Sequence, residues 1–228
     1  MAKGGINMAL PKQGRAFLFV PALLVATLGW PACLLQAQED WARRDKWQRP
    51  AEVLDALGVK PGSFVADVGA GDGYFAFHLA ARVGSLGRVY AEDILEDELA
   101  KIRSRKAKQG LSQIETILGT PSDPRLPAET LDAILVVNAY HEMPEFDAML
   151  QGMYGALKPG GLLAIIDAQD EPGQPRNVYQ ERHTLPAEIV REDAARHGLR
   201  FPRELPGFSN PESKRKYYFL LFEKPKRG

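Results

Sequence analysis

Short apolar segments alternate with amphipathic or charged segments along most of the chain after Ala51. Apolar runs of this length between turn residues are typical of buried strands, whereas the longer segments repeat their apolar positions with a helical period. Leu131–Asn138 is nearly all apolar, as expected for a parallel strand buried on both faces. The predicted strands are Phe64–Val68, Arg88–Glu92, Ile114–Leu118, Leu131–Asn138, Leu162–Ala168 and Lys216–Glu223. The predicted helices are Ala51–Leu57, Tyr74–Val83, Leu95–Gln109, Phe146–Leu157 and Pro186–His197.

This alternation predicts right-handed crossovers between parallel strands. We therefore expect an α/β fold, a Rossmann-like doubly wound sheet of about seven strands with helices on both faces. The sheet should be mostly parallel, with Lys216–Glu223 antiparallel beside Leu162–Ala168. Asp170–Arg176 and Pro202–Ser213 are rich in Pro, Gly and charge, so they are predicted to be mobile or substrate-facing loops.

Composition and charge narrow the choice of partner. The 228 residues fit one domain with a short extension. Twenty-nine basic residues balance 29 acidic ones, so no bulk electrostatic attraction to nucleic acid or to an anionic membrane is expected. The sequence indicates no particular oligomeric state.

The N-terminal segment, residues 1–37, differs from the rest. It carries basic but no acidic side chains, an apolar run at Ala16–Trp30, and a possible cleavage site at Leu35-Gln36-Ala37. This pattern is typical of a secretory signal peptide, which predicts export to the periplasm or medium. The alternative is an uncleaved membrane anchor, although Ala16–Leu35 is barely long enough to span a bilayer. An anchored chain would stay at the inner membrane, and a chain without either would be cytoplasmic.

The single cysteine, Cys33, excludes a disulfide framework and a cysteine metal site. Residues 38–50 form a polar lead-in that contains Trp41 and Trp47. We expect a surface segment whose two aromatic side chains pack on the core. The alternative is a segment that lies across the mouth of the site.

The most informative stretch is Phe64–Phe75, in which a buried strand ends in glycines at alternate positions, Gly69, Gly71 and Gly73. Glycine permits positive φ and lets a ligand approach the backbone closely. At the carboxyl end of the first strand of an α/β sheet, such a turn marks a binding crevice.

The residues around these glycines argue against a dinucleotide. A Rossmann fingerprint needs a third glycine where this chain has Tyr74. The carboxylates of Asp67 and Asp72 would also repel a pyrophosphate, which binds free backbone N–H groups at a helix N-terminus. Two carboxylates suit a ligand that carries an ammonium and a sulfonium group.

An acid followed by G-x-G-x-G resembles motif I of the class I S-adenosylmethionine-dependent methyltransferases. Acids at Asp93 and Asp123, and the Lys158-Pro159-Gly160-Gly161 turn, follow in the order that this family has. The chain is similar to small-molecule methyltransferases of the type 11 kind, and to a bacterial subgroup with an exported N-terminus. The resemblance implies a methyltransferase domain over residues 51–228, S-adenosyl-L-methionine as cofactor, and methyl transfer to a small-molecule acceptor.

The resemblance also implies cofactor-binding residues. Asp67 with Gly69, Gly71 and Gly73 would hold the aminocarboxypropyl end. Asp93 stands where a strand-end acid can accept hydrogen bonds from both ribose hydroxyls. Its neighbour Glu92 should face away, because side chains alternate along a strand.

Three further residues are implied contacts. Ile94 would cover the adenine and Asp123 would accept from its amino group. Asn138, at the end of the fourth strand, would contact the methionine part of the cofactor or the substrate.

Tyr140 and His141 are the catalytic candidates, because they follow the fourth strand beside the crevice. An imidazole there could take a proton near neutral pH, or both side chains could only shape the pocket. His141, Glu142 and His183 match no known metal-ligand spacing, so no metal site is predicted. Other functions left open are an NAD(P)-dependent oxidoreductase, an aminopropyl transferase and a non-catalytic module that binds S-adenosylmethionine.

Overall fold

The structure is a computed structural model that describes residues 1–2 and 32–228. The apolar run Ala16–Trp30 of the expected signal peptide lies outside the described residues, and of the alternative anchor Ala16–Leu35 only residues 32–35 are described. Within the described residues, no helix has both the length and the apolar character needed to cross a bilayer.

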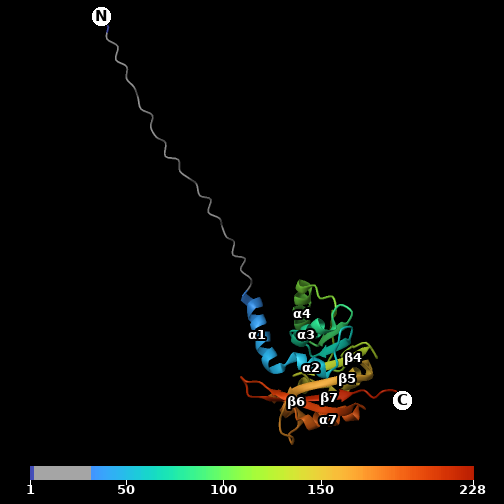
Figure 1. Ribbon diagram of the computed structural model, residues 1–228. Coiled ribbons are helices and arrows are strands. Elements are labelled where there is room, and N and C mark those ends of the chain that lie inside the picture. The colour runs from blue at the N-terminus through green and yellow to red at the C-terminus, as the bar shows by residue number, and fades with distance from the viewer. Residues whose placement is uncertain (3–31) are drawn as a thin grey trace.

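A seven-stranded sheet in the order β3-β2-β1-β4-β5-β7-β6 forms the centre of the molecule (Figure 1). The strands are β1 Phe64–Val68, β2 Arg88–Asp93, β3 Ile114–Leu118, β4 Leu131–Val137, β5 Leu157–Ala168, β6 Arg200–Ser209 and β7 Lys216–Glu223. The helices are α1 Ala32–Gln48, α2 Pro50–Ala56, α3 Tyr74–Val83, α4 Glu96–Gln109, the 3₁₀ turn η1 Tyr140–Glu142, α5 Phe146–Ala156, α6 Arg176–Arg182 and α7 Ala187–Arg196.

The strand directions confirm the expected Rossmann-like sheet. β3, β2, β1, β4 and β5 run parallel to one another. β7 pairs antiparallel with both β5 and β6, so it is the reversed strand near the C-terminus. The strand order reverses direction between β1 and β4, because the chain moves first toward β3 and then returns to the other side of β1. Open α/β sheets bind their ligands at such a switch point.

Alternation along the strands divides the core into two layers, one on each face of the sheet. On β4, Ala133 and Leu135 pack in the layer that contains α2, α3 and α4. Ile134 and Val136 pack in the opposite layer, which contains α5, α6 and α7. Neighbouring side chains of a strand point to opposite faces, so an apolar strand such as β4 can serve both layers.

The C-terminal part corrects one expected loop. Pro202–Ser213 was predicted as a loop, but its first residues belong to β6, which pairs with β7 at the edge of the sheet. β6 is almost entirely exposed and contains Pro202 and Pro206. Prolines are tolerated on edge strands, where one side of the backbone needs no partner. A strand with a single buried position, Phe208, has no apolar alternation to reveal it.

Two further segments differ from expectation at the level of local structure. The lead-in at residues 38–50 is mostly helical, as part of α1. Asp170–Arg176 is a loop as predicted up to its last residue, where α6 begins. The helix expected from Pro186 to His197 is observed as α7.

Candidate functional site

A cavity of about 400 Å³ opens at the carboxyl ends of β1, β4 and β5, at the switch point of the sheet. The loop after β1 supplies one wall, and residues from α1, β6 and β7 supply the others. The lining residues are Arg44, Trp47, Gln48, Asp67, Gly69, Ala70, Gly71, Asp72, Tyr74, Phe75, Val137, Asn138, Ile166, Phe208, Asn210 and Tyr217.

The glycine loop needs its first two glycines for different reasons. A Cβ on Gly69 would lie 2.5 Å from the Cβ of Ala139, so this glycine lets the loops after β1 and β4 approach each other. Gly71 has φ of 53° and a Cβ there would meet nothing within 4 Å. Gly71 also lines the cavity, so a side chain at this position would take up ligand space. Both positions fit the predicted cofactor-binding role.

Gly73 has a packing role in this structure. Its φ is 88°, and a Cβ would lie 2.9 Å from Ile102 and 3.1 Å from the ring of Phe77. Gly73 is the residue before α3, and it is buried between that helix and α4. It does not line the cavity, so it shapes the loop without offering a ligand contact of its own.

Asp67 is the acid that reaches the cavity from below the glycine loop. It is only 3% exposed, and its Oδ2 has no hydrogen-bond partner among the described residues. Burial raises the pKa of this carboxyl to about 7, and the nearby charge of Arg44 offsets only part of that rise. A buried carboxylate oxygen without a donor is costly, so Asp67 favours a ligand that brings a cation or an N–H group.

Asp93 binds the glycine loop directly. Its Oδ2 accepts from the backbone N–H of Gly71 at 2.8 Å, and its Oδ1 accepts from that of Leu95 at 2.9 Å. Each carboxylate oxygen can accept a second hydrogen bond. Asp93 can therefore hold the loop and still accept from ligand hydroxyls beside it.

Glu92 contacts the glycine loop as Asp93 does, although neither side chain lines the cavity. Its Oε2 accepts from the N–H of Gly69 at 3.3 Å, and its Oε1 has no partner among the described residues. Burial raises the pKa of Glu92 to about 8, and its hydrogen bond from Gly69 offsets part of that rise.

The remaining predicted cofactor residues are placed differently from one another. Asn138 lines the cavity in the left-handed region, with φ of 54°, and its N–H donates to the carbonyl of Ile166 at 2.8 Å. Ile94 is 49% exposed and Asp123 lies in an exposed turn, where it accepts from the N–H of Arg125. Neither lines the cavity, although both follow strands that end at the same edge of the sheet. Their adenine contacts stay predictions.

The lead-in closes the cavity as well as packing on the core. Trp41 donates to Asp72 at 3.0 Å and its ring lies edge-on to Tyr74, which fixes α1 on α3. Arg44 lies over the ring of Tyr74 at 3.8 Å and pairs with Asp72 at 3.6 Å. Trp47 then reaches the cavity beside α1's end. Both alternatives for residues 38–50 therefore describe part of the structure.

His141 is oriented by a buried carboxylate. Its Nδ1 lies 2.8 and 2.9 Å from the two oxygens of Asp167, and its backbone N–H donates to the same carboxylate at 3.0 Å. Both side chains are completely buried. The register explains the contact, because β4 and β5 are paired and His141 follows β4 while Asp167 lies near the end of β5. An Asp–His pair of this kind fixes the ring and its tautomer.

Tyr140 points into the core. Its hydroxyl donates to Asp193 of α7 at 2.9 Å, and Arg176 binds the same carboxylate at 2.8 Å. Burial raises the pKa of Tyr140 above its ordinary value. The catalytic role predicted for Tyr140 therefore has no support in this geometry, since its hydroxyl is neither free nor acidic.

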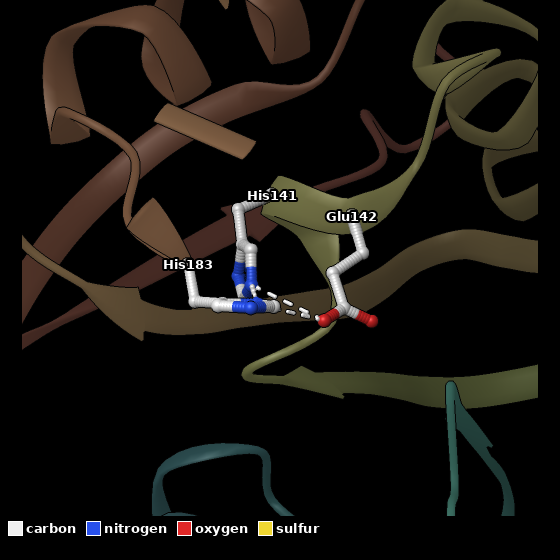
Figure 2. Close-up of side chains that lie close together, drawn as sticks. All are labelled: His141, Glu142 and His183. Carbon is white, nitrogen blue, oxygen red and sulfur yellow. Dashed lines mark hydrogen bonds and ion pairs between the residues drawn. The ribbon is translucent and has the colours of Figure 1, made fainter. Parts of the chain in front are cut away.

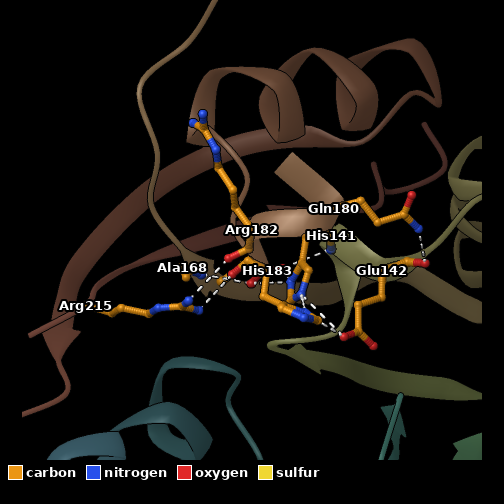
Figure 3. A network of polar contacts seen from close by, with 8 residues as sticks. His141, Glu142, Ala168, Gln180, Arg182, His183 and Arg215 are labelled. Atoms are coloured by element: carbon orange, nitrogen blue, oxygen red, sulfur yellow. Dashed lines mark hydrogen bonds and ion pairs between the residues drawn. The ribbon is translucent and has the colours of Figure 1, made fainter. Parts of the chain in front are cut away.

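His183 and Glu142 meet the free side of the His141 ring (Figure 2). His183 Nδ1 lies 3.4 Å from His141 Nε2 and 3.0 Å from Glu142 Oε1. His183 follows α6 in the left-handed region, with φ of 53°. Arg215 holds it there by donating to the carbonyls of Arg182 and His183, both at 3.2 Å (Figure 3). The fold thus brings together three residues whose spacing in the sequence does not predict a cluster.

Comparison with known sequences identifies the central segment. Residues 65–161, from β1 into β5, match a family described as a methyltransferase domain. The matched segment covers less than half of the chain. This segment contains the glycine loop, Asp93, Asp123 and His141, and it confirms the resemblance to the S-adenosylmethionine-dependent methyltransferases.

Relatives extend the match on both sides of the domain. A demethylmenaquinone methyltransferase of Listeria monocytogenes is 30% identical over 145 residues, which is 62% of this chain and 60% of the relative. A SAM-dependent methyltransferase of Aquifex aeolicus has a solved structure that superposes with a TM-score of 0.68 at 25% identity, over 84% of this chain and 97% of that one. The chain thus shares the methyltransferase fold, and spans 60% of the curated relative's length.

One solved structure shows how far this fold can diverge. The [4+2]-cyclase SpnF superposes with a TM-score of 0.69 at 17% identity, over 79% of this chain and 82% of that one. That likeness is one of fold alone, because a fold hosts many chemistries. The activity has to be argued from the site.

Several residues of the site could not be predicted from the sequence. Asp167 looked like part of a buried strand, and Arg44, Phe208 and Tyr217 come from the two ends of the described chain. Only the pairing of β5 with β7 and the contact of α1 with α3 bring them to the cavity. An acid at the carboxyl end of β5 was the one available signal for Asp167.

Proposed function

We propose that the chain is an S-adenosylmethionine-dependent methyltransferase that acts on a small, aromatic, hydroxylated acceptor. The observation that carries the proposal is Asp67 Oδ2, a buried carboxylate oxygen without a partner on the wall of the glycine-loop cavity. S-Adenosylmethionine presents an ammonium group, which such an oxygen can bind. A pyrophosphate in this cavity would face Asp67 and Asp72 together, so the nicotinamide alternative is disfavoured.

The residues present fit the cofactor. Gly71 leaves open space at the loop, Asp67 offers an acceptor for the ammonium group, and Asp93 offers acceptors for hydroxyls. When bound, the cofactor supplies a methyl group on a positively charged sulfur, which is already activated for transfer. The chain's task is then to align the acceptor and exclude water, which can supply about 7–11 kcal/mol of the barrier.

The walls favour an aromatic acceptor. Trp47 packs on Tyr217 at 5.3 Å between ring centroids and on Phe208 at 6.5 Å, and all three line the cavity. Aromatic side chains in such walls prefer flat, apolar partners. The curated relative acts on a demethylmenaquinone by its name, so quinols and phenols are the acceptors to test first.

The Asp167–His141 pair supplies the chemistry next to this cavity. Asn138 and Ile166 line the cavity, and His141 and Asp167 lie close after them in the chain. Transfer to a hydroxyl requires removal of a proton, and an imidazole held by a carboxylate promotes that step. We propose that His141 Nε2, with His183 beside it, is the atom at which the acceptor's proton is controlled.

Cofactor binding tests the proposal directly. S-Adenosylmethionine and S-adenosylhomocysteine should raise the melting temperature of the purified chain, and NAD should not. Asp93→Ala should weaken binding of S-adenosylhomocysteine by about 1.5–3 kcal/mol, as measured by calorimetry, because a charged acceptor is lost. Asp97→Ala is the matched control, because Asp97 is an exposed acid in the first turn of α4.

Two results would contradict the proposal. If NAD stabilises the chain and S-adenosylhomocysteine does not, the cofactor assignment fails. If the chain binds S-adenosylhomocysteine but converts no quinol, phenol or amine in a panel with labelled methyl donor, the chain is a binding module and the enzymatic part fails.

We further propose that the N-terminal segment directs export. The basic and apolar pattern of residues 1–37 supports this. Cleavage after Ala37 would keep Arg44, Trp47 and Gln48, which line the cavity, on the mature chain. The intact mass of the chain from fractionated cells tests the proposal, because an uncleaved cytoplasmic chain would refute it.

A further inference from the structure

We infer that His141, Glu142 and His183 form a binding site for a divalent transition metal ion of the zinc class. His141 Nε2, His183 Nδ1 and Glu142 Oε1 converge from η1 and the end of α6, within 4.8 Å of one another (Figure 2). Two imidazoles and one carboxylate are a ligand set found in catalytic zinc sites, in which the fourth position stays open.

The distances between these atoms fit a common ion. His141 Nε2 is 3.4 Å from His183 Nδ1, His183 Nδ1 is 3.0 Å from Glu142 Oε1, and Glu142 Oε1 is 3.6 Å from His141 Nε2. Around a tetrahedral zinc with bonds of about 2.0–2.1 Å, neighbouring ligand atoms are about 3.3 Å apart. The three separations scatter around that value, so an ion fits between the atoms with small shifts of the two exposed side chains.

The carboxylate of Asp167 is the second, independent observation. It accepts from Nδ1 of His141 at 2.8 Å, on the side of the ring opposite to the cluster. In the neutral imidazole this leaves the lone pair on Nε2, which then points at His183 and Glu142. Metal-binding histidines almost always donate their other N–H to a carboxylate, a carbonyl or water. The buried pair thus has the arrangement that a metal ligand needs.

The backbone around the other two ligands is also held in place (Figure 3). Gln180 donates to the carbonyl of Glu142 at 3.0 Å, and Arg215 donates to the carbonyl of His183 at 3.2 Å. The N–H of Leu185 donates to the carbonyl of Ala168, beside Asp167. These contacts connect α6, η1 and β5, so the ligands come from segments that are already fixed to one another.

The open position of the ion would suit an oxygen of the acceptor. A bound zinc ion would lower the pKa of a coordinated hydroxyl, so the acceptor would lose its proton to water at the ion, and His141 Nε2, as a ligand of the ion, would not take that proton itself. This use in methyl transfer rests on the proposed function, whereas binding of the ion does not.

Titration with zinc and cobalt(II) tests the site. The full chain, purified with a tag that contains no histidine and treated with a chelator, should bind one Zn²⁺ per chain by calorimetry. Bound Co²⁺ should show the visible absorption of a four-coordinate ion. His183→Ala and Glu142→Gln should each weaken binding at least tenfold, and Asp167→Asn should weaken it by about 10–100-fold.

His197→Ala is the matched control, because His197 also pairs with a carboxylate, Asp147, at 2.9 Å, but lies outside the cluster. Its affinity for Zn²⁺ should equal that of the unaltered chain. His183 and Glu142 are 58% and 57% exposed, so their variants should fold, and circular dichroism checks this. The inference is overturned if the unaltered chain binds no stoichiometric Zn²⁺, or if His183→Ala binds it as tightly. These readouts involve no methyl transfer, so a failed methyltransferase assay leaves them valid.

Discussion

The carboxylate of Asp67, whose Oδ2 has no partner among the described residues, gives the sharpest prediction, which concerns the substitution Asp67→Asn. Asparagine has nearly the same shape but stays neutral at every pH. Burial raises the pKa of Asp67 to about 7 from an ordinary value of 3.8. At about 1.4 kcal/mol per pH unit, this difference corresponds to at most about 4 kcal/mol of folding free energy.

The direction of the change in stability follows from proton binding. The folded chain holds the proton of Asp67 more tightly than the unfolded chain does, so this group costs stability as the pH rises from about 4 to about 7. Asp67→Asn removes that cost. The variant should match the unaltered chain near pH 4, exceed it by about 1–2 kcal/mol at pH 5, and exceed it by up to about 4 kcal/mol at pH 8.

Urea denaturation at these pH values measures the difference, with Asp97→Asn as a control at an exposed position. The same variant should bind S-adenosylhomocysteine more weakly at pH 8, by about 1.5–3 kcal/mol, because the ammonium group loses its charged partner. A variant that is less stable than the unaltered chain at pH 8, or whose advantage does not change with pH, would refute the reasoning.

Other substitutions separate structural from ligand-binding roles. Tyr140→Phe should cost about 1–3 kcal/mol in urea denaturation, because Asp193 loses a buried donor, yet leave turnover unchanged; a large loss of turnover at full stability would restore a catalytic role. Gly71→Ala should cost about 1 kcal/mol of stability through its positive φ, and weaken S-adenosylhomocysteine binding at least tenfold by filling the cavity. An unchanged affinity in calorimetry would show that the ligand does not approach this glycine. Trp41→Phe should keep the packing on Tyr74 but lose the hydrogen bond to Asp72, so protease should cut α1 faster; an equal rate of cleavage would show that the hydrogen bond does not hold the helix.

The parallel core of the sheet could be predicted because burial leaves a direct mark on the sequence. β1, β4 and β5 contact apolar layers on both faces, and continuous apolar runs such as Leu131–Val137 result from this. β6 left no such run, because all of its side chains except Leu205 and Phe208 are exposed and its prolines resemble those of a loop. The prediction therefore succeeded where side-chain burial determines the structure, and was wrong where only backbone pairing at a sheet edge does.

The candidate site, like the fold, could be predicted from the sequence only in part. Asp67, Gly69 and Gly71 lie within one turn, so their chemistry could be interpreted from adjacent letters. The His141 cluster needs Asp167 and His183, which are distant in sequence and meet through strand pairing and the position of α6. The spacing of ligands in a sequence indicates a metal site only when the ligands share one local element. It therefore gives no sign of a cluster built from η1 and the end of α6.

The buried acids at the switch point should make the binding of a charged cofactor depend on pH. Burial raises the pKa of Asp67 to about 7 and that of Glu92 to about 8, and the nearby charge of Asp93 adds to both rises. Near neutral pH the empty crevice therefore keeps a proton on at least part of this pair. A cation that enters favours the ionised form of Asp67, so its binding should release a proton, and its affinity should rise with pH up to about 7. A phosphate would be repelled by the ionised carboxylates, so it would bind best at a pH at which they are protonated. The buried acids thus make the crevice selective for a cation through the desolvation cost that they carry when it is empty.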